Sequence, residues 1–177
     1  MPPSDRGRCI EYIYNSNTLG PAYMYSKYLN HLNGRNGHPC YTVSCIGKMA
    51  LPGYALYTSA KFGMHGFQQA IRLEMPSNMK MTCLYPVGTD TNFFAAGSDG
   101  VEIKKPWPIQ RPEYIAKCMF KGMVKGKKEI YPHLWSLLWP FMNNIDICRK
   151  IFWAMEQSKM RYNFEVIAAA KKEQASK

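Results

Sequence analysis

The spacing of apolar residues divides the first half of the chain into a helix, a strand and a second helix. Apolar residues recur at loosely helical intervals over residues 10–32, and the Asn-Gly pairs that follow end this helix. Residues 39–44 form a short apolar run rich in strand formers, which predicts a buried strand. A second long helix is predicted over residues 54–75, where Pro76 ends it. Its expected core residues are Phe62, Phe67, Ala70, Ile71 and Leu73.

The second half of the chain continues this alternation. Strands are predicted near residues 80–86 and 129–131, on either side of a helix that begins at Pro112 and ends near Gly126. Residues 134–162 predict one or two further apolar helices. Because strands that alternate with helices usually form parallel sheets, the sequence predicts an α/β fold of three layers, with a parallel sheet between flanking helices.

Length and composition indicate a folded protein with a single domain. A chain of 177 residues is long enough to bury a core, and a content of 46% hydrophobic and 20% charged residues is typical of a globular protein. We expect the core over residues 10–131, a helical segment over 132–165 and a polar tail over 166–177.

The chain is basic, with a formal net charge of +11 and a pI near 9.4. This charge favours an anionic partner, such as a nucleotide phosphate, a nucleic acid or an acidic membrane surface. The basic residues are spread along the chain, apart from a cluster at Lys125, Lys127 and Lys128, and no nucleic-acid-binding motif is present. We therefore expect no nucleic acid as a partner.

The six cysteines indicate a reducing, intracellular and cytoplasmic setting. They form no C-x-x-C pair and have no metal-like spacing with the four histidines, so neither disulfides nor a metal site is expected. The N-terminal residues lack the apolar core of a signal peptide, and no apolar run approaches the roughly 18 residues of a spanning helix.

Three polar residues lie where an α/β sheet places its chemistry. Ser44 ends the first predicted strand, and Tyr57 and Lys61 lie one turn apart on the next helix. Ligands of open parallel sheets bind beyond the carboxyl ends of the strands. A Tyr-Lys pair alone is typical of an ordinary exposed helix face, so the case for a site depends on all three residues. His65, two turns after Tyr57, is interpreted as a surface or packing residue rather than a catalyst.

The segment SCIGKMALPGYALYTSAKFG closely resembles the catalytic stretch of the short-chain dehydrogenase/reductase family. In that family a serine lies 13 positions before the tyrosine of a Y-x-x-x-K motif, and Ser44, Tyr57 and Lys61 match all three positions. Upstream, NSNTLG is similar to the family's N-x-x-G segment. Asn17 is the better match because Gly20 follows it by three positions, and Asn15 is the weaker candidate.

A downstream segment, YPVGTDTNFF, is similar to the family's P-G-x-x-x-T segment, which touches the nicotinamide end of the cofactor. Val87 separates the proline from the glycine here, whereas Thr91 suits the threonine position. The resemblance covers about residues 15–131 and implies a partial Rossmann-like sheet. The catalytic residues that it implies are Asn17, Ser44, Tyr57 and Lys61. The cofactor-binding residues that it implies are Tyr57, Lys61, Pro86, Gly88, Thr89 and Thr91.

The resemblance implies an oxidoreductase that uses NAD or NADP to interconvert a carbonyl and an alcohol. Tyr57 would be the acid/base, and we expect the neighbouring Lys61 ammonium to lower its pKa. Lys61 would also hold the nicotinamide ribose. Ser44 would polarise the substrate carbonyl, and Asn17 would anchor a water that relays protons toward Lys61.

The family's glycine-rich T-G-x-x-x-G-x-G segment does not occur in this sequence. We therefore expect that an N-terminal half, with the residue that selects NAD or NADP, is absent, and that the chain alone neither binds NAD(P) tightly nor turns over substrate. Two hypotheses remain open. The chain is the catalytic portion of an NAD(P)-dependent oxidoreductase, or it is an inactive remnant that serves as an interaction or structural module.

The substrate class is predicted from the segment HLWSLLWPFMNNIDICRKIFWAM. In the family, this region commonly shapes the substrate pocket, so residues 132–165 would lie on the substrate side. The residues Trp135, Leu138, Trp139 and Phe141 favour a bulky apolar carbonyl, such as a lipid or a steroid. The alternative is peripheral membrane contact, because tryptophans beside Arg149 and Lys150 suit a headgroup boundary.

The resemblance also implies self-association. The helices that contain Tyr23 and Phe62 resemble the family's dimer-forming pair, and the strand ending at Ser44 would have an open edge. We therefore expect a homo-oligomer.

Overall fold

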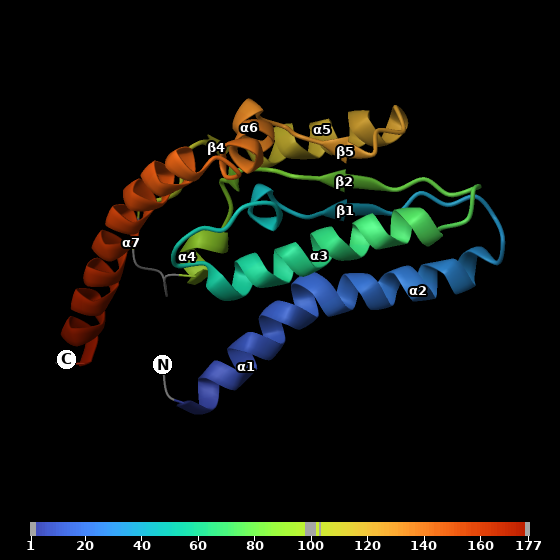
Figure 1. The fold of residues 1–177 in the computed structure, drawn as a ribbon. Coiled ribbons are helices and arrows are strands. Elements are labelled where there is room, and N and C mark those ends of the chain that lie inside the picture. Colours follow the sequence, from blue (N-terminus) through green and yellow to red (C-terminus); the bar gives the residue numbers. More distant parts are fainter. Residues whose placement is uncertain (1–2, 98–101, 103, 176–177) are drawn as a thin grey trace.

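A three-stranded parallel sheet in the order β1-β2-β5 lies at the centre of the fold (Figure 1). The strands are Cys40–Thr42, Thr82–Leu84 and Glu129–Ile130, with Tyr41 opposite Cys83 and Leu84 opposite Ile130. The computed structural model describes residues 3–97, 102 and 104–175. The predicted α/β fold with parallel strands is confirmed, and within the described ranges β1 and β5 are the edge strands.

Helices cover both faces of this sheet. One face carries α2 (Gly20–Leu32) and α3 (Ala55–Glu74), with α1 (Pro3–Tyr14) packed against α3, and the other face carries α5 (Pro112–Val124) (Figure 1). Side chains alternate along a strand, so Cys83 and Tyr85 pack toward α2 and α3, while Leu84 packs with Ile115 of α5.

The buried face of α3 differs from the predicted one. Phe62 is 42% exposed, Leu73 is 90% exposed and Ala70 is also exposed, so their prediction as core residues is wrong. Phe67 and Ile71 pack only partly against the core, and the fully buried positions include Met64 and Gln68. A polar residue is tolerated at position 68 because Arg72, His65 and Cys83 are hydrogen-bond partners of its side chain.

The predicted helix over residues 10–32 is interrupted by a π-helical turn at Asn15–Leu19. The Gly20 N–H donates to the Asn15 carbonyl, and a Cβ at Gly20 would meet that oxygen at 2.6 Å. Pro21 has no N–H to give to the Asn17 carbonyl in the usual α-helical pattern. A glycine followed by a proline therefore fits a wider turn at this point.

The C-terminal part forms two helices, α6 (Leu134–Met142) and α7 (Asp146–Ala175). The segment predicted as a polar tail over 166–177 is helical as far as Ala175, because α7 continues through it. No Gly or Pro lies between residues 146 and 175, and the Ala, Lys, Glu and Gln residues at its end are strong helix formers.

Several small elements were not predicted. They are the 3-10 turn Cys45–Gly47, the parallel pair of β3 (Gly88–Thr89) and β4 (Ile109–Gln110), and the short helix α4 (Phe93–Gly97). All six cysteines are free thiols. Within the described part of the chain, no helix is long and apolar enough to cross a membrane.

Candidate active site

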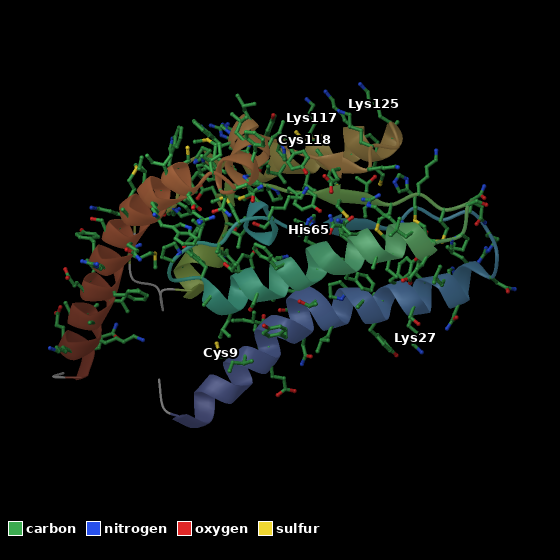
Figure 2. The ribbon with its side chains drawn as sticks, in the orientation of Figure 1. Cys9, Lys27, His65, Lys117, Cys118 and Lys125 are labelled. Atoms are coloured by element: carbon green, nitrogen blue, oxygen red, sulfur yellow. The ribbon has the colours of Figure 1, made fainter. Side chains whose placement is uncertain are left out.

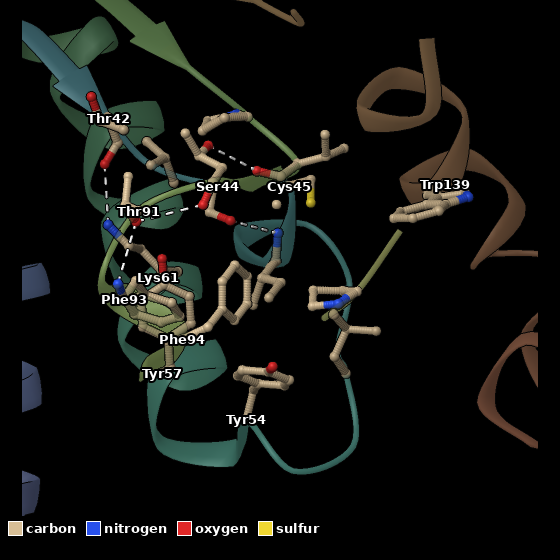
Figure 3. Close-up of a pocket in the computed structure, with 18 of the residues that line it drawn as sticks. Thr42, Ser44, Cys45, Tyr54, Tyr57, Lys61, Thr91, Phe93, Phe94 and Trp139 are labelled. Atoms are coloured by element: carbon tan, nitrogen blue, oxygen red, sulfur yellow. Dashed lines mark hydrogen bonds between the residues drawn. The ribbon is translucent and has the colours of Figure 1, made fainter. Parts of the chain in front are cut away.

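A cavity of about 210 Å³ opens beyond the carboxyl ends of β1 and β2 (Figure 3). This is the sheet edge at which the sequence predicted a ligand site. Seven of the predicted site residues line the cavity: Ser44, Tyr57, Lys61, Pro86, Gly88, Thr89 and Thr91. The structure thus brings these seven residues to one cavity, whereas Asn17 lies outside its lining.

Ser44 lies in a strained turn between β1 and the 3-10 turn. Its φ of 143° is positive, a conformation that side chains other than glycine rarely adopt. The Ser44 hydroxyl accepts a hydrogen bond from the Ile46 N–H (3.3 Å), and the next residue, Cys45, donates its N–H to the Pro86 carbonyl (2.9 Å). These bonds hold the turn against the end of β2 and direct the serine into the cavity.

Gly47 lets this turn approach α3 closely. A Cβ at Gly47 would lie 2.9 Å from the Lys61 carbonyl oxygen and 2.9 Å from Val43 Cγ1. Any side chain there would push the turn that carries Ser44 away from the helix that carries Lys61. The glycine therefore sets the separation of these two functional groups.

Tyr57 and Lys61 lie one turn apart on α3, and both point into the cavity (Figure 3). The Lys61 ammonium lies 5.6 Å from the centroid of the Tyr57 ring and donates a hydrogen bond to the Thr42 carbonyl (3.1 Å). The lysine side chain is buried, yet this is its one hydrogen bond among the described residues. An ammonium has three N–H donors, so two remain for a ligand.

Burial controls the ionisation of both groups. It raises the pKa of Tyr57 to about 12, and a hydrogen bond with Ser44 offsets only part of this rise. It also lowers the pKa of Lys61 from 10.5 to about 8. Burial therefore decides the pKa of Tyr57 in the free cavity, and the expectation that Lys61 lowers this pKa stays a prediction. At neutral pH the tyrosine is protonated and Lys61 is mostly charged.

The Asn17 side chain does not point into the cavity. Its Nδ2 donates to the Ile13 carbonyl (2.9 Å) and to the Ser16 hydroxyl (3.0 Å). The next residue joins this turn to the site, since the Thr18 hydroxyl donates to the carbonyl of Ala60 (2.7 Å), the neighbour of Lys61. The π-helical turn therefore contacts α3 beside Lys61 through the Thr18 side chain, and the role predicted for Asn17 stays a prediction.

Aromatic side chains form much of the cavity wall (Figure 3). The Phe93 ring lies 5.2 Å from the Tyr57 ring, and Trp139 of α6 closes another side. Trp139 was predicted for a pocket, whereas Tyr54, Phe93 and Trp107 were missed. Two of these carried a signal, because Tyr54 precedes Tyr57 by one helical turn and Phe93 follows Thr91 by two residues. Nothing in the local sequence pointed to Trp107.

Comparison with known sequences identifies relatives for the part of the chain that holds this cavity. The family model for short chain dehydrogenases matches residues 5–101 of this chain. The 3-ketodihydrosphingosine reductase of Bos taurus is 30% identical over 124 residues, which cover 66% of this chain and 37% of the relative. The 17-beta-hydroxysteroid dehydrogenase 13 of Rattus norvegicus is 28% identical over 127 residues, which cover 69% and 41%. The chain thus spans about two fifths of the length of these relatives.

Solved structures share the fold. A short chain dehydrogenase from Burkholderia cenocepacia J2315 in complex with NADP superposes with a TM-score of 0.65 at 17% identity, covering 80% of this chain and 56% of that one. A short-chain dehydrogenase from Sphingobium yanoikuyae in complex with NADPH gives a TM-score of 0.61 at 17% identity, covering 78% and 53%.

Proposed function

The chain belongs to the short-chain dehydrogenase family, and from that premise we propose that its cavity serves the NAD(P)-dependent interconversion of a ketone and an alcohol on an apolar substrate. The observation that supports this most is the convergence of Ser44, Tyr57 and Lys61 on one cavity. Ser44 supplies a hydroxyl that can bind the substrate oxygen, Tyr57 supplies a proton on oxygen, and Lys61 supplies a positive charge.

The polar end of the cavity fits the nicotinamide and its ribose. The two free N–H donors of Lys61 suit the ribose hydroxyls, and Thr89 and Thr91 line the same end of the cavity. Gly88 allows Ile109 to pack closely against this part of the cavity wall, because a Cβ at position 88 would lie 2.6 Å from Ile109 Cδ1. A reduced nicotinamide bound there would supply a hydride to the substrate carbonyl carbon.

Tyr57 would give its proton to the substrate oxygen. With a pKa of about 12 in the free cavity, Tyr57 holds this proton throughout the neutral range, so it is prepared to act as an acid in ketone reduction. Ser44 would donate to the same oxygen and fix its direction. The Lys61 ammonium would then stabilise the phenolate that is left behind.

An apolar substrate suits the remaining walls. Phe93, Phe94, Trp107 and Trp139 contribute large apolar surfaces to the cavity lining. The bovine and rat relatives are named for a ketodihydrosphingosine and a hydroxysteroid, both of which are largely apolar. We therefore propose a long-chain or polycyclic ketone as the substrate class. NAD and NADP remain alternatives, since solved relatives hold either one.

Reduced nicotinamide mononucleotide tests this proposal without the adenosine half of the cofactor. We expect it to bind, and we expect Lys61→Met to weaken binding by at least about tenfold, because charge-assisted hydrogen bonds of about 1.5–3 kcal/mol are lost. The matched control is Lys27→Met, which removes an exposed lysine of α2. Calorimetric titration gives both affinities. Equal affinity of the two variants would contradict the role of Lys61, and no binding at all would favour the alternative of a non-catalytic interaction module.

A further inference from the structure

The outer face of α5 carries lysines at helical spacing with apolar side chains between them. Lys117, Lys121 and Lys125 follow one another at intervals of one turn, and Figure 2 shows Lys117 and Lys125 pointing away from the body of the protein. On the same face, Phe120 is 63% exposed and Val124 is 70% exposed. This side of the helix is therefore both basic and apolar.

The positive charge of this face has no local counterpart. No acidic residue occurs between Glu113 and Glu129, whereas five lysines do. None of these lysine side chains makes an ion pair within the ranges that the structure describes. Glu129 is already bound by Lys48 and by the Tyr131 hydroxyl. The face therefore keeps a net positive charge that only an external partner could balance.

The neighbouring helix α6 adds an uncharged apolar surface. Residues 134–145 contain no charged side chain, and Leu134, Leu137 and Phe141 are 65%, 51% and 68% exposed on one side of α6. The opposite side carries Trp139, which lines the cavity. The Tyr114 hydroxyl of α5 donates to the carbonyl of Pro132 (3.0 Å), so α6 begins beside the start of α5 (Figure 1).

We propose that α5 and α6 form a docking face for the surface of an anionic lipid bilayer. Lysines along α5 suit acidic headgroups, while Phe120, Val124 and the α6 side chains suit the adjacent acyl boundary. A second copy of this chain fits poorly, because a symmetric contact over α5 would oppose lysine to lysine. A nucleic acid would use the lysines but leave the uncharged face of α6 exposed to water. The inference does not depend on the proposed enzymatic activity.

Vesicle co-sedimentation of the 177-residue protein tests the proposal. We expect binding to vesicles that contain phosphatidylserine, little binding to phosphatidylcholine alone, and weaker binding as salt is added. Lys121→Gln with Lys125→Gln should weaken binding roughly 30-fold, since each lysine near such a surface contributes about 1 kcal/mol. The matched control, Lys27→Gln with Lys172→Gln, removes the same charge from α2 and α7 and should change binding by less than about threefold.

A second pair of variants tests the apolar part at constant charge. Leu137→Ser with Phe141→Ser should weaken binding by roughly tenfold or more, because exposed side chains that would enter the acyl boundary are lost. Circular dichroism checks that each variant is folded. Three results would overturn the proposal: no binding to anionic vesicles, equal losses from the two lysine pairs, or binding only to a DNA duplex.

Discussion

Helix α3 carries two buried polar regions that differ in how completely their groups are bonded. At its first half, Lys61 faces the cavity with one hydrogen bond, to the Thr42 carbonyl. Two turns later, Gln68 has no exposed surface and accepts hydrogen bonds from Arg72 Nε (2.6 Å) and Cys83 Sγ (3.7 Å). Its amide Nε2 donates to His65 Nδ1 (3.2 Å). The region at Lys61 therefore has N–H donors without an acceptor among the described residues, whereas the region at Gln68 uses nearly all of its donors.

The fully bonded region continues across the sheet. His65 Nδ1 lies 2.8 Å from the Tyr85 hydroxyl, and the oxygen of that hydroxyl lies 3.4 Å from Glu129 Oε1. Lys48 donates to the same carboxylate (3.0 Å) and lies over the Tyr85 ring. Burial and the charge of Lys48 hold the pKa of His65 below its ordinary value. The histidine that was predicted to be a surface or packing residue is thus one of the residues that connect α3 to the sheet.

The difference shows what burial of a polar group does in each case. Where every donor has an acceptor, burial strengthens the bonds and joins the secondary structure elements. Where donors are left over, burial costs stability and keeps a group ready for a ligand. We therefore expect substitutions in the first region to lower activity without lowering stability, and those in the second region to lower stability.

The largest effect should come from Tyr57→Phe. The phenol hydroxyl is the proposed proton donor. In the protein joined to a glycine-rich cofactor-binding half, its removal should lower ketone reduction by about 10²–10⁴-fold. The aromatic ring and its contact with Phe93 remain, so the free energy of unfolding should change by less than about 1 kcal/mol. Rates with excess NADPH and urea unfolding measure the two quantities. A large loss of stability with an unchanged rate would show that Tyr57 contributes to folding rather than to catalysis.

The next effect is on stability, at Gln68. Gln68→Met keeps the volume but leaves Arg72 Nε without its acceptor and His65 without its donor. We expect the free energy of unfolding to fall by roughly 2–3 kcal/mol. Gln69→Met, at the exposed neighbouring position, is the control and should change it by less than about 0.5 kcal/mol. Equal effects of the two variants in urea unfolding would mean that the network contributes nothing.

Lys61→Met should stabilise the protein at neutral pH. The fall of the Lys61 pKa from 10.5 to about 8 means that the buried ammonium destabilises the folded state by roughly 3 kcal/mol. Loss of the hydrogen bond to Thr42 in the variant offsets about 1 kcal/mol of this. The net gain is roughly 2 kcal/mol. Because the folded-state pKa is the lower one, the penalty is complete below pH 8 and disappears as pH rises toward 10.5. Unfolding of both proteins at pH 7 and pH 10 should show the gain only at pH 7.

Glu129→Gln should give the smallest effect. Burial alone would raise the pKa of Glu129, but hydrogen bonds from Tyr131 and Lys48 outweigh it and hold the pKa below its ordinary value. We expect a loss of about 1 kcal/mol at pH 7, since the pair with Lys48 is partly exposed. Because the pKa of Glu129 is lower in the folded state than in the unfolded state, its stabilising contribution is lost as the pH falls through the folded-state pKa. The exposed Glu165→Gln is the control, and a difference from wild type that persisted at pH 3 would contradict this cause.

The features that could be predicted from the sequence are local ones. Apolar runs at 39–44, 80–86 and 129–131 gave the strands, and the spacing of Ser44, Tyr57 and Lys61 gave the cavity. Features that depend on distant partners were missed. Gln68 is buried because Arg72 and His65 meet it there, and no periodicity reveals that. The raised pKa of Tyr57 likewise depends on walls such as Phe93 and Trp139, which fold over it from other elements.

The length of α7 affects how the molecule moves in solution. Thirty helical residues extend about 45 Å, whereas a compact domain of 177 residues has a radius of gyration of about 16 Å. In Figure 1, α7 runs past the end of the sheet rather than along it. The protein should therefore tumble as an elongated body with unequal rotational diffusion times. A monomer of 20.4 kDa will elute early in gel filtration, so its association state has to be measured by light scattering or sedimentation equilibrium.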